Sequence, residues 1–283
     1  MTHLELSLTK QQTEKKYNYC VIDCQFNDWS LGIATYTDAQ QFKKIDEMPK
    51  TDDMKIIILD VRDRHLYNNN KLAIFKTNMT NVEILNDKCL FANFMMLKYP
   101  NNIPQTIYNK RLTSDENSNN FVLSDYDSTK PRKMIKKISN GYAGIGVSII
   151  YDFKDFSEQN NIIVSDYIEH NDFYSGHFVV NNGIIIEQIY FKSTTKGDKS
   201  YIQRSSISNY EILTYDTLKQ HADLTIFNNI FKDLNYSGFA CPNFIIVDQN
   251  IIIFEINPRP GGSLMNNKEY CKKFFNKIID DQI

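Results

Sequence analysis

The chain has 283 residues, of which 42% are hydrophobic and 23% charged, a composition typical of a folded protein with a substantial buried core. Its formal net charge of -2 provides no overall field that would attract nucleic acid or an acidic membrane, so we expect neither as a partner. The apolar runs are too short to cross a bilayer, the N-terminus has no signal-peptide pattern, and the five scattered cysteines indicate a reducing compartment, so we expect a cytoplasmic location.

The N-terminal part of the chain predicts a short α/β unit over residues 1–85. Three apolar, β-branched runs in it have the length and composition of strands. These runs are 19–22, 55–59 and 72–75.

The remainder, 86–283, predicts helices and strands in mixed order. A helix capped by Asp87 is expected over 87–96, and a longer helix over 216–234. Further strands are expected over 133–137, 147–150, 162–168, 175–180, 243–247 and 251–256. Turn residues at 181–183 and 248–250 predict two hairpins, and the polar segment 192–200 predicts an exposed loop.

The most informative segment runs from Ile251 to Ser263. On a strand, residues two apart face the same way, so Glu255 and Asn257 project together. A carboxylate and an amide oxygen side by side are hard oxygen ligands, which suit magnesium that carries nucleotide phosphates. Arg259, just after the strand, is a candidate to hold a transferring phosphoryl group. The alternative for this segment is a strand that ends in a Pro-Gly turn and exposes a surface glutamate.

Together with the glycines that follow Arg259, this segment resembles the closing Glu-x-Asn-x-Arg motif of the ATP-grasp superfamily. Three further matches occur in the family's order, so the resemblance covers about 86–263. It implies an ATP-grasp fold, mixed α/β and α+β, behind a short N-terminal α/β unit. Within it, 125–180 would form a lid subdomain that carries a glycine loop. The L-amino-acid and dipeptide ligases are the nearest in character.

Two lysines match phosphate-binding positions of the family. Lys88 lies in the first turn of a predicted helix, where by itself it would be an ordinary solvated charge. Lys137 lies at the end of a predicted strand, directly before a glycine loop whose backbone amides would cover the ATP phosphates. Lys136 is the rival for this role, but Lys137 keeps the family's spacing to the loop. The glycines of that loop are Gly141, Gly144 and Gly146.

The segment that starts at Ser165 resembles the family's hinge, Glu-x-aromatic-Ile-x-Gly-x-Glu. The resemblance implies that adenine contacts the backbone near Asp166 and Ile168 and that Asp172 binds the ribose hydroxyls. The alternative for Asp172 is an ordinary hairpin acid. Two positions depart from the pattern, because Ser165 replaces a common Glu and His170 replaces a common Gly.

The family's first metal ligand is usually an acid, and it aligns here with Asn243. The implied metal ligands are therefore Asn243, Glu255 and Asn257, for Mg²⁺ or alternatively Mn²⁺. An amide oxygen ligates magnesium without neutralising its charge. Either a second metal binds weakly, or Asp248 or another acid compensates.

The resemblance implies an ATP-dependent ligase that activates a carboxylate as an acylphosphate and joins it to an amine or similar nucleophile. The partners would be small molecules, namely a carboxylate and an amine such as an amino acid or peptide, and a homodimer is an open alternative to a single chain. Arg259 and Arg204 are the candidate catalytic residues, with Arg204 binding the substrate carboxylate. Two rivals remain: a phosphotransferase with the same fold, and a catalytically degenerate nucleotide-binding regulatory protein.

Overall fold

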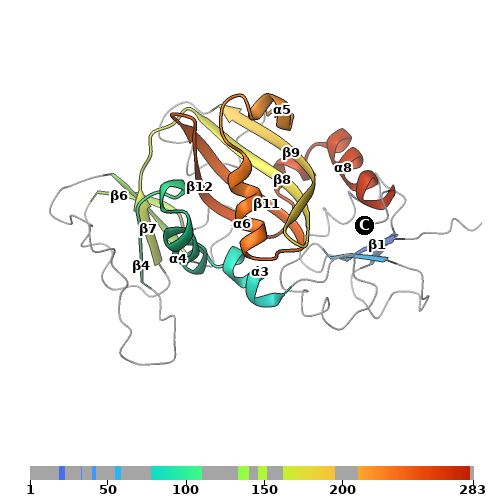
Figure 1. The fold of residues 1–283 in the computed structure, drawn as a ribbon, viewed down its shortest axis with the longest axis horizontal. Helices are drawn as coiled ribbons and strands as arrows, with labels where there is room; N and C mark the ends of the chain where they lie inside the picture. Colours follow the sequence, from blue (N-terminus) through green and yellow to red (C-terminus); the bar gives the residue numbers. More distant parts are fainter. Residues whose placement is uncertain are drawn as a thin grey trace, which may run out of the picture.

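The computed structural model describes residues 19–22, 33, 40–42, 55–58, 78–109, 133–139, 146–151, 162–194 and 210–280. Within these ranges the strands form three sheets, and helices lie between and over them (Figure 1). None of the described helices is long and apolar enough to span a membrane.

The N-terminal sheet is parallel, as expected for an α/β unit. Its central strand β1 (Tyr19–Ile22) pairs with β3 (Lys55–Ile58) on one side and with β2 (Gln40–Phe42) on the other. Two of the three predicted strands are therefore confirmed, and β2 is an additional one. The third predicted strand, 72–75, lies outside the described residues.

The central sheet has five strands in the order β10-β9-β8-β11-β12, each antiparallel to its neighbours. Both predicted hairpins are confirmed, because the β8–β9 and β11–β12 turns consist of residues with positive φ, which tight hairpin turns require. The strands are β8 (Asp172–Asn181), β9 (Ile184–Thr194), β10 (Glu211–Leu213), β11 (Gly238–Val247) and β12 (Asn250–Asn257).

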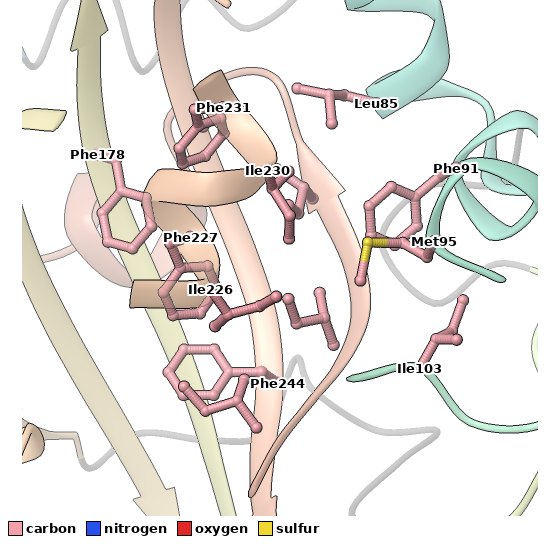
Figure 2. Packing of buried hydrophobic residues seen from close by; sticks show 14 of the residues in the cluster. Leu85, Phe91, Met95, Ile103, Phe178, Ile226, Phe227, Ile230, Phe231 and Phe244 are labelled. Atoms are coloured by element: carbon pink, nitrogen blue, oxygen red, sulfur yellow. The ribbon is translucent and has the colours of Figure 1, made fainter. Parts of the chain in front are cut away.

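One face of the central sheet is covered by α6 (Thr225–Asp233), which packs aromatic rings against β8 and β11 (Figure 2). The Phe227 ring lies 5.1 Å from the rings of both Phe178 and Phe244, measured between centroids, and Phe231 lies 5.8 Å from Phe178. Burial of each such side chain contributes about 1.5–3 kcal/mol. Because this aromatic layer covers one face of β11 and β12, their opposite face is the one available for other contacts.

Two successive helices, α3 (Met79–Asn86) and α4 (Lys88–Lys98), extend the same core beyond β12. The side chain of Asp87 ends one helix and caps the next by accepting from the backbone N–H groups of Cys89 and Leu90, which confirms the predicted cap. A short 3-10 turn, η3 (Pro100–Asn102), follows α4. The Asn102 side chain of this turn donates to the backbone carbonyl of Ile251 at 2.9 Å, which fastens the C-terminal end of α4 to the start of β12.

The third sheet has four antiparallel strands in the order β4-β7-β5-β6, and we call it the lid sheet. It packs on the central sheet through a cluster that joins Ile135 to Phe173, Ile245 and Phe254. In Figure 1 it lies beside α4 at the left of the molecule. Its strands are β4 (Thr106–Asn109), β5 (Met134–Ile138), β6 (Ser148–Ile150) and β7 (Ile162–Asp166).

The C-terminal helix α8 (Lys268–Asp280) covers the other face of the central sheet at the end remote from the lid sheet (Figure 1). The Phe239 ring of β11 lies 6.4 Å from Phe274 and 5.5 Å from Phe275. A short helix, α7 (Gly262–Met265), connects β12 to α8.

The prediction of a single long helix over 216–234 is wrong. The structure has a short α5 (Tyr215–Leu218), an irregular segment, and then α6. The Asp223 carboxylate accepts a hydrogen bond of 2.9 Å from the backbone N–H of Thr225, and this local contact starts a new helix instead of continuing the old one. The predicted loop at 192–200 is also partly wrong, since β9 continues to Thr194.

Candidate functional site

A β-bulge brings the polar end of β12 to the face that looks toward the lid sheet. Asn243 pairs with Glu255, but the next residue, Phe244, pairs with Ile253, so Phe254 is the extra residue of the bulge. Before the bulge Ile253 points into the helix-covered core, whereas Phe254 packs with the lid sheet. The extra residue interrupts the alternation of faces along β12, so Glu255 lies on the same face as Phe254.

A chain of side-chain hydrogen bonds runs across three strands on this face. The Ser175 hydroxyl donates to Oδ1 of Asn243 at 2.8 Å, and Nδ2 of Asn243 donates to Oε1 of Glu255 at 2.9 Å. The amide of Asn257 also donates to Oε1 of Glu255, at 3.3 Å. The three predicted metal ligands therefore lie together, and Ser175 orients the amide of one of them.

Lys88 approaches the same carboxylate from the N-terminus of α4. Its Nζ lies 3.9 Å from Oε2 of Glu255 and donates to the backbone carbonyl of Ser139 at 3.4 Å. The buried Ser139 hydroxyl in turn donates to the Asp87 carboxylate at 2.8 Å. These contacts join α4, the end of β5 and β12 around one ion pair, whose side chains are only 14% and 19% exposed.

Lys137 points into the space between the two sheets. It is buried, and it shares a face of β5 with Ile135, which packs against the central sheet. Its Nζ lies 5.5 Å from the centre of the Phe254 ring. Lys136 lies on the opposite face, which carries Met134 and its separate cluster.

A pocket lies where α4, the lid sheet and β12 meet, and both lysines line it. Its walls are mainly apolar, so the two ammonium groups are its principal charges. Ammonium groups in a largely apolar cleft favour an anionic ligand, because an anion accepts charge-assisted hydrogen bonds from them and offsets the cost of burying positive charge. The lining residues are Lys88, Phe91, Ala92, Ile103, Pro104, Thr106, Lys137, Ile163, Ser165 and Phe254.

The predicted hinge follows β7 at the edge of this pocket. Ser165 lines the pocket, and the backbone N–H of Asp166 donates to the carbonyl of Gln105 at 3.0 Å. Nδ1 of His170 contacts the carbonyl of Ile168 at 2.7 Å, and the His170 ring lies 5.9 Å from that of Phe254. The hinge therefore lies next to Phe254, the extra residue of the bulge.

Asp172 has other partners. Its carboxylate forms an ion pair of 3.0 Å with Lys192 and accepts a hydrogen bond of 2.9 Å from Thr194. Along β8 it shares a face with Tyr174, which belongs to the helix-covered core. The structure thus places Asp172 on the other face of the sheet from Glu255, and its binding of ribose stays a prediction.

The glycine loop is described only at its end. Gly141 and Gly144 lie outside the described residues, as does Arg204. Gly146 has a φ of +76°, and a Cβ atom there would collide with the Ile138 side chain. A side chain at this position would be strained and would displace the Ile138 side chain.

The turn after β12 is fastened to the sheet by His177, which the sequence patterns do not single out. The backbone N–H of Gly261 donates to Nδ1 of His177 at 3.2 Å, and Nε2 lies 2.7 Å from the Ser263 hydroxyl. Burial, reinforced by the positive charge of Arg259, lowers the pKa of this imidazole to about 3. His177 and Ser175 lie two residues apart on β8 and therefore face the same way. The two-residue period of a strand, applied to β8, would have placed both on one face.

The donor set fits a magnesium ion that already carries phosphate oxygens. Glu255 offers a carboxylate, and Asn243 and Asn257 offer amide oxygens after side-chain rotation. Asp248 does not supply the missing charge, since it lies in the β11–β12 turn, five residues from Asn243 and roughly 16 Å along an extended strand. Among the described residues, no group of three or more His, Cys, Asp or Glu side chains is placed to hold a metal.

Comparisons with known proteins show the family of the chain. The model of a family described as ATP-grasp domain matches residues 85–263, more than half of the chain. A comparison with curated proteins finds no match.

Among solved structures, D-alanine–D-alanine ligase from Bacillus anthracis matches with a TM-score of 0.62 and 14% identity, over 94% of this chain and 97% of that chain. The same protein complexed with ATP gives a TM-score of 0.61 and 15% identity over the same shares. L-amino acid ligase from Bacillus licheniformis has a TM-score of 0.51 and 14% identity, over 89% of this chain and 69% of that chain. At these identities the likeness is one of fold.

Proposed function

Because the chain belongs to the ATP-grasp domain family, we propose that it is an ATP-dependent ligase that joins a carboxylate to an amine. The observation that carries the proposal is the convergence of Lys88 and Lys137 on one cleft, with the Glu255 carboxylate 3.9 Å from Nζ of Lys88. The two ammonium groups would hold the phosphates of ATP. The apolar walls and the Phe254 ring would receive the base.

Magnesium would be held by Glu255 and Asn257, with Asn243 as a neutral third donor. Bound there, the ion would neutralise phosphate charge and withdraw electrons from the transferred phosphoryl group. The hydrogen bonds from Asn243 and Asn257 keep the carboxylate turned toward the cleft. Lys88, whose Nζ is 3.9 Å from Glu255, would then bridge the metal ligand and the phosphates.

The reaction would proceed in two steps. A carboxylate oxygen of the first substrate attacks the γ-phosphorus of ATP, the bond to the bridging oxygen breaks, and ADP leaves. The amine then attacks the acyl carbon, phosphate leaves with the former carboxylate oxygen, and the amine loses a proton. Arg259 would stabilise the negative charge of the transferred group. The lid sheet and glycine loop would keep water from the acylphosphate.

Support for the substrate class comes from the relatives. The similar structures include an L-amino acid ligase and a phosphoribosylamine–glycine ligase. We therefore propose an amino acid or a similar small carboxylate as one substrate, and an amine as the other. Cys89, Cys241 and Cys271 are buried in the thiol form, which supports the reducing, cytoplasmic setting that we propose.

The test is ADP release from purified protein with magnesium, ATP and a matrix of carboxylates and amines, followed by mass spectrometry of the products. A ligase forms ADP, phosphate and an amide only when both substrates are present. A phosphotransferase would form ADP and a stable phosphorylated product without an amine. A regulatory nucleotide-binding protein would bind ATP and form no product.

A further inference from the structure

A buried histidine attaches the turn that carries Arg259 to the central sheet. Arg259 lies between β12 and α7, and its own backbone N–H donates to the carbonyl of Asn257 at 2.8 Å. Its Nη1 donates to the carbonyl of Pro260 at 3.1 Å, so the side chain is also tied to the turn. Two residues later the backbone reaches His177.

The contacts of the imidazole define its protonation. Gly261 donates a backbone hydrogen to Nδ1, so Nδ1 must carry the lone pair and Nε2 the proton. Nε2–H then donates to the Ser263 hydroxyl at 2.7 Å. One ring therefore holds both ends of the turn in one tautomer. Its pKa of about 3 keeps it neutral at physiological pH, so it neither exchanges protons nor attracts phosphate.

The surroundings leave the turn no room to shift toward the sheet. A Cβ atom on Gly261 would lie 2.5 Å from Sγ of Cys241 and 2.8 Å from Cε1 of His177. The edge of the imidazole meets the Phe191 ring at a centroid distance of 5.3 Å and an angle of 89°. The absence of a side chain at Gly261 is what allows its N–H to reach the ring.

We propose that His177 is a positioning residue, which holds the turn at Gly261 so that Arg259 is placed beside the Glu255–Asn257 pair for phosphoryl transfer. The inference rests on the proposed function, because it assigns a role to Arg259 in that reaction. His177 itself does not touch the substrates. Its loss should therefore lower the catalytic contribution of Arg259 while leaving nucleotide binding at the two lysines largely unchanged.

Two substitutions separate the contacts of the ring. In His177→Asn the amide oxygen lies near the former Nδ1, so it keeps an acceptor for the Gly261 N–H. His177→Leu keeps bulk and removes both hydrogen bonds. His221, which is exposed on the segment before α6, gives the matched control His221→Leu. Each protein is first checked for folding by circular dichroism.

Hydrogen exchange of the segment 258–263 tests the anchor without reference to activity. We expect at least tenfold faster exchange in His177→Leu and near wild-type exchange in His177→Asn and His221→Leu. Unchanged exchange in His177→Leu would show that His177 does not anchor the turn. This conclusion would hold whatever reaction the protein catalyses.

A double-mutant cycle on kcat tests the positioning role. Arg259→Ala should lower kcat at least a hundredfold in the wild-type background but less than tenfold in the His177→Leu background, with KM for ATP changed less than threefold by His177→Leu. Equal effects in both backgrounds would show that His177 has a merely structural role. If wild-type protein binds ATP but shows no turnover with any substrate pair, the proposed function fails, and the catalytic part of this inference falls with it.

Discussion

The side-chain amide of Asn243 donates a hydrogen bond of 2.9 Å to the carboxylate of Glu255, from the adjacent position on the neighbouring strand. An acid at the position of Asn243 would instead place two carboxylates together. Like charges at that distance repel unless a cation lies between them. In the proposed metal site, this pair would therefore supply one carboxylate and one neutral donor.

Asn243→Asp should convert this into a stronger metal site. Without metal we expect the variant to be less stable than wild type by about 1–2 kcal/mol, because of repulsion and the lost hydrogen bond. With Mn²⁺ and a non-hydrolysable ATP analogue, the variant should bind more Mn²⁺ per chain than wild type, measured by electron paramagnetic resonance. Asn228→Asp, exposed on α6 at the other face of the central sheet, is the control. Equal Mn²⁺ binding by wild type and Asn243→Asp would contradict this account of the site.

Glu255→Gln should abolish turnover and preserve the fold. The amide keeps the size of the side chain but removes the charge that faces Lys88 and the metal, which should cost several kcal/mol at the transition state, on the order of a hundredfold or more in kcat. Steady-state ADP release and circular dichroism measure the two effects. A variant that keeps most of its activity would show that Glu255 is not a metal ligand.

The two adjacent lysines of β5 should behave differently. Lys137 faces the pocket, whereas Lys136 faces away from it. Lys137→Ala should weaken binding of an ATP analogue at least tenfold, which corresponds to about 1.4 kcal/mol for a charge-assisted hydrogen bond. Lys136→Ala should change it little. Calorimetry measures the affinity of both variants for the analogue. A larger loss of affinity in Lys136→Ala would place the phosphates on the other side of the lid sheet.

The buried His177 predicts how stability depends on pH. Its pKa is about 3 in the folded protein and near 6.5 in the unfolded chain, so the unfolded state binds more protons between these values. Stability should therefore fall as pH falls below 6.5, with a slope approaching about 1.4 kcal/mol per pH unit from this group. Urea denaturation between pH 7 and pH 4.5 should show a shallower slope in His177→Asn. An unchanged slope would mean that His177 is accessible to protons in the folded state.

Gly146 and Gly262 form a matched pair for backbone strain. Gly146 has a positive φ and no room for a Cβ atom, whereas a Cβ atom on Gly262 would meet nothing within 4 Å. Gly146→Ala should lower the free energy of unfolding by about 1–2 kcal/mol, and Gly262→Ala should change it by less than about 0.5 kcal/mol. Thermal denaturation measures both. Similar effects would show that the end of the glycine loop tolerates a side chain.

Much of the family segment was predictable because its motifs are local. The motif matches predict a family region over 86–263, and the family model matches 85–263. Glu255, Asn257 and Arg259 lie within five residues of one another, and Lys88 follows directly from the cap at Asp87. The family's spacing to the glycine loop favoured Lys137 over Lys136 for the cleft. Alternation along a strand requires the two side chains to face opposite ways, and the structure places them on opposite faces.

What the sequence patterns missed depends on pairing between distant segments. Ser175 reaches Asn243 only because β8 and β11 are neighbours, and no periodicity along either strand shows this. The bulge at Phe254 is a mismatch between two strands and is invisible in one of them. The helix over 216–234 was mispredicted because apolar spacing continues through a segment where Asp223 captures a backbone N–H.

The central claim, carboxylate activation by ATP, is tested most directly by oxygen transfer. Candidate amino acids labelled with ¹⁸O in the carboxylate are incubated with the protein, magnesium, ATP and amines, and the released inorganic phosphate is analysed by mass spectrometry. An acylphosphate route transfers one carboxylate oxygen to phosphate, so we expect phosphate carrying a single ¹⁸O in amounts equal to the amide formed. Release of unlabelled phosphate alongside the amide, or a phosphorylated product with no free phosphate, would contradict the account.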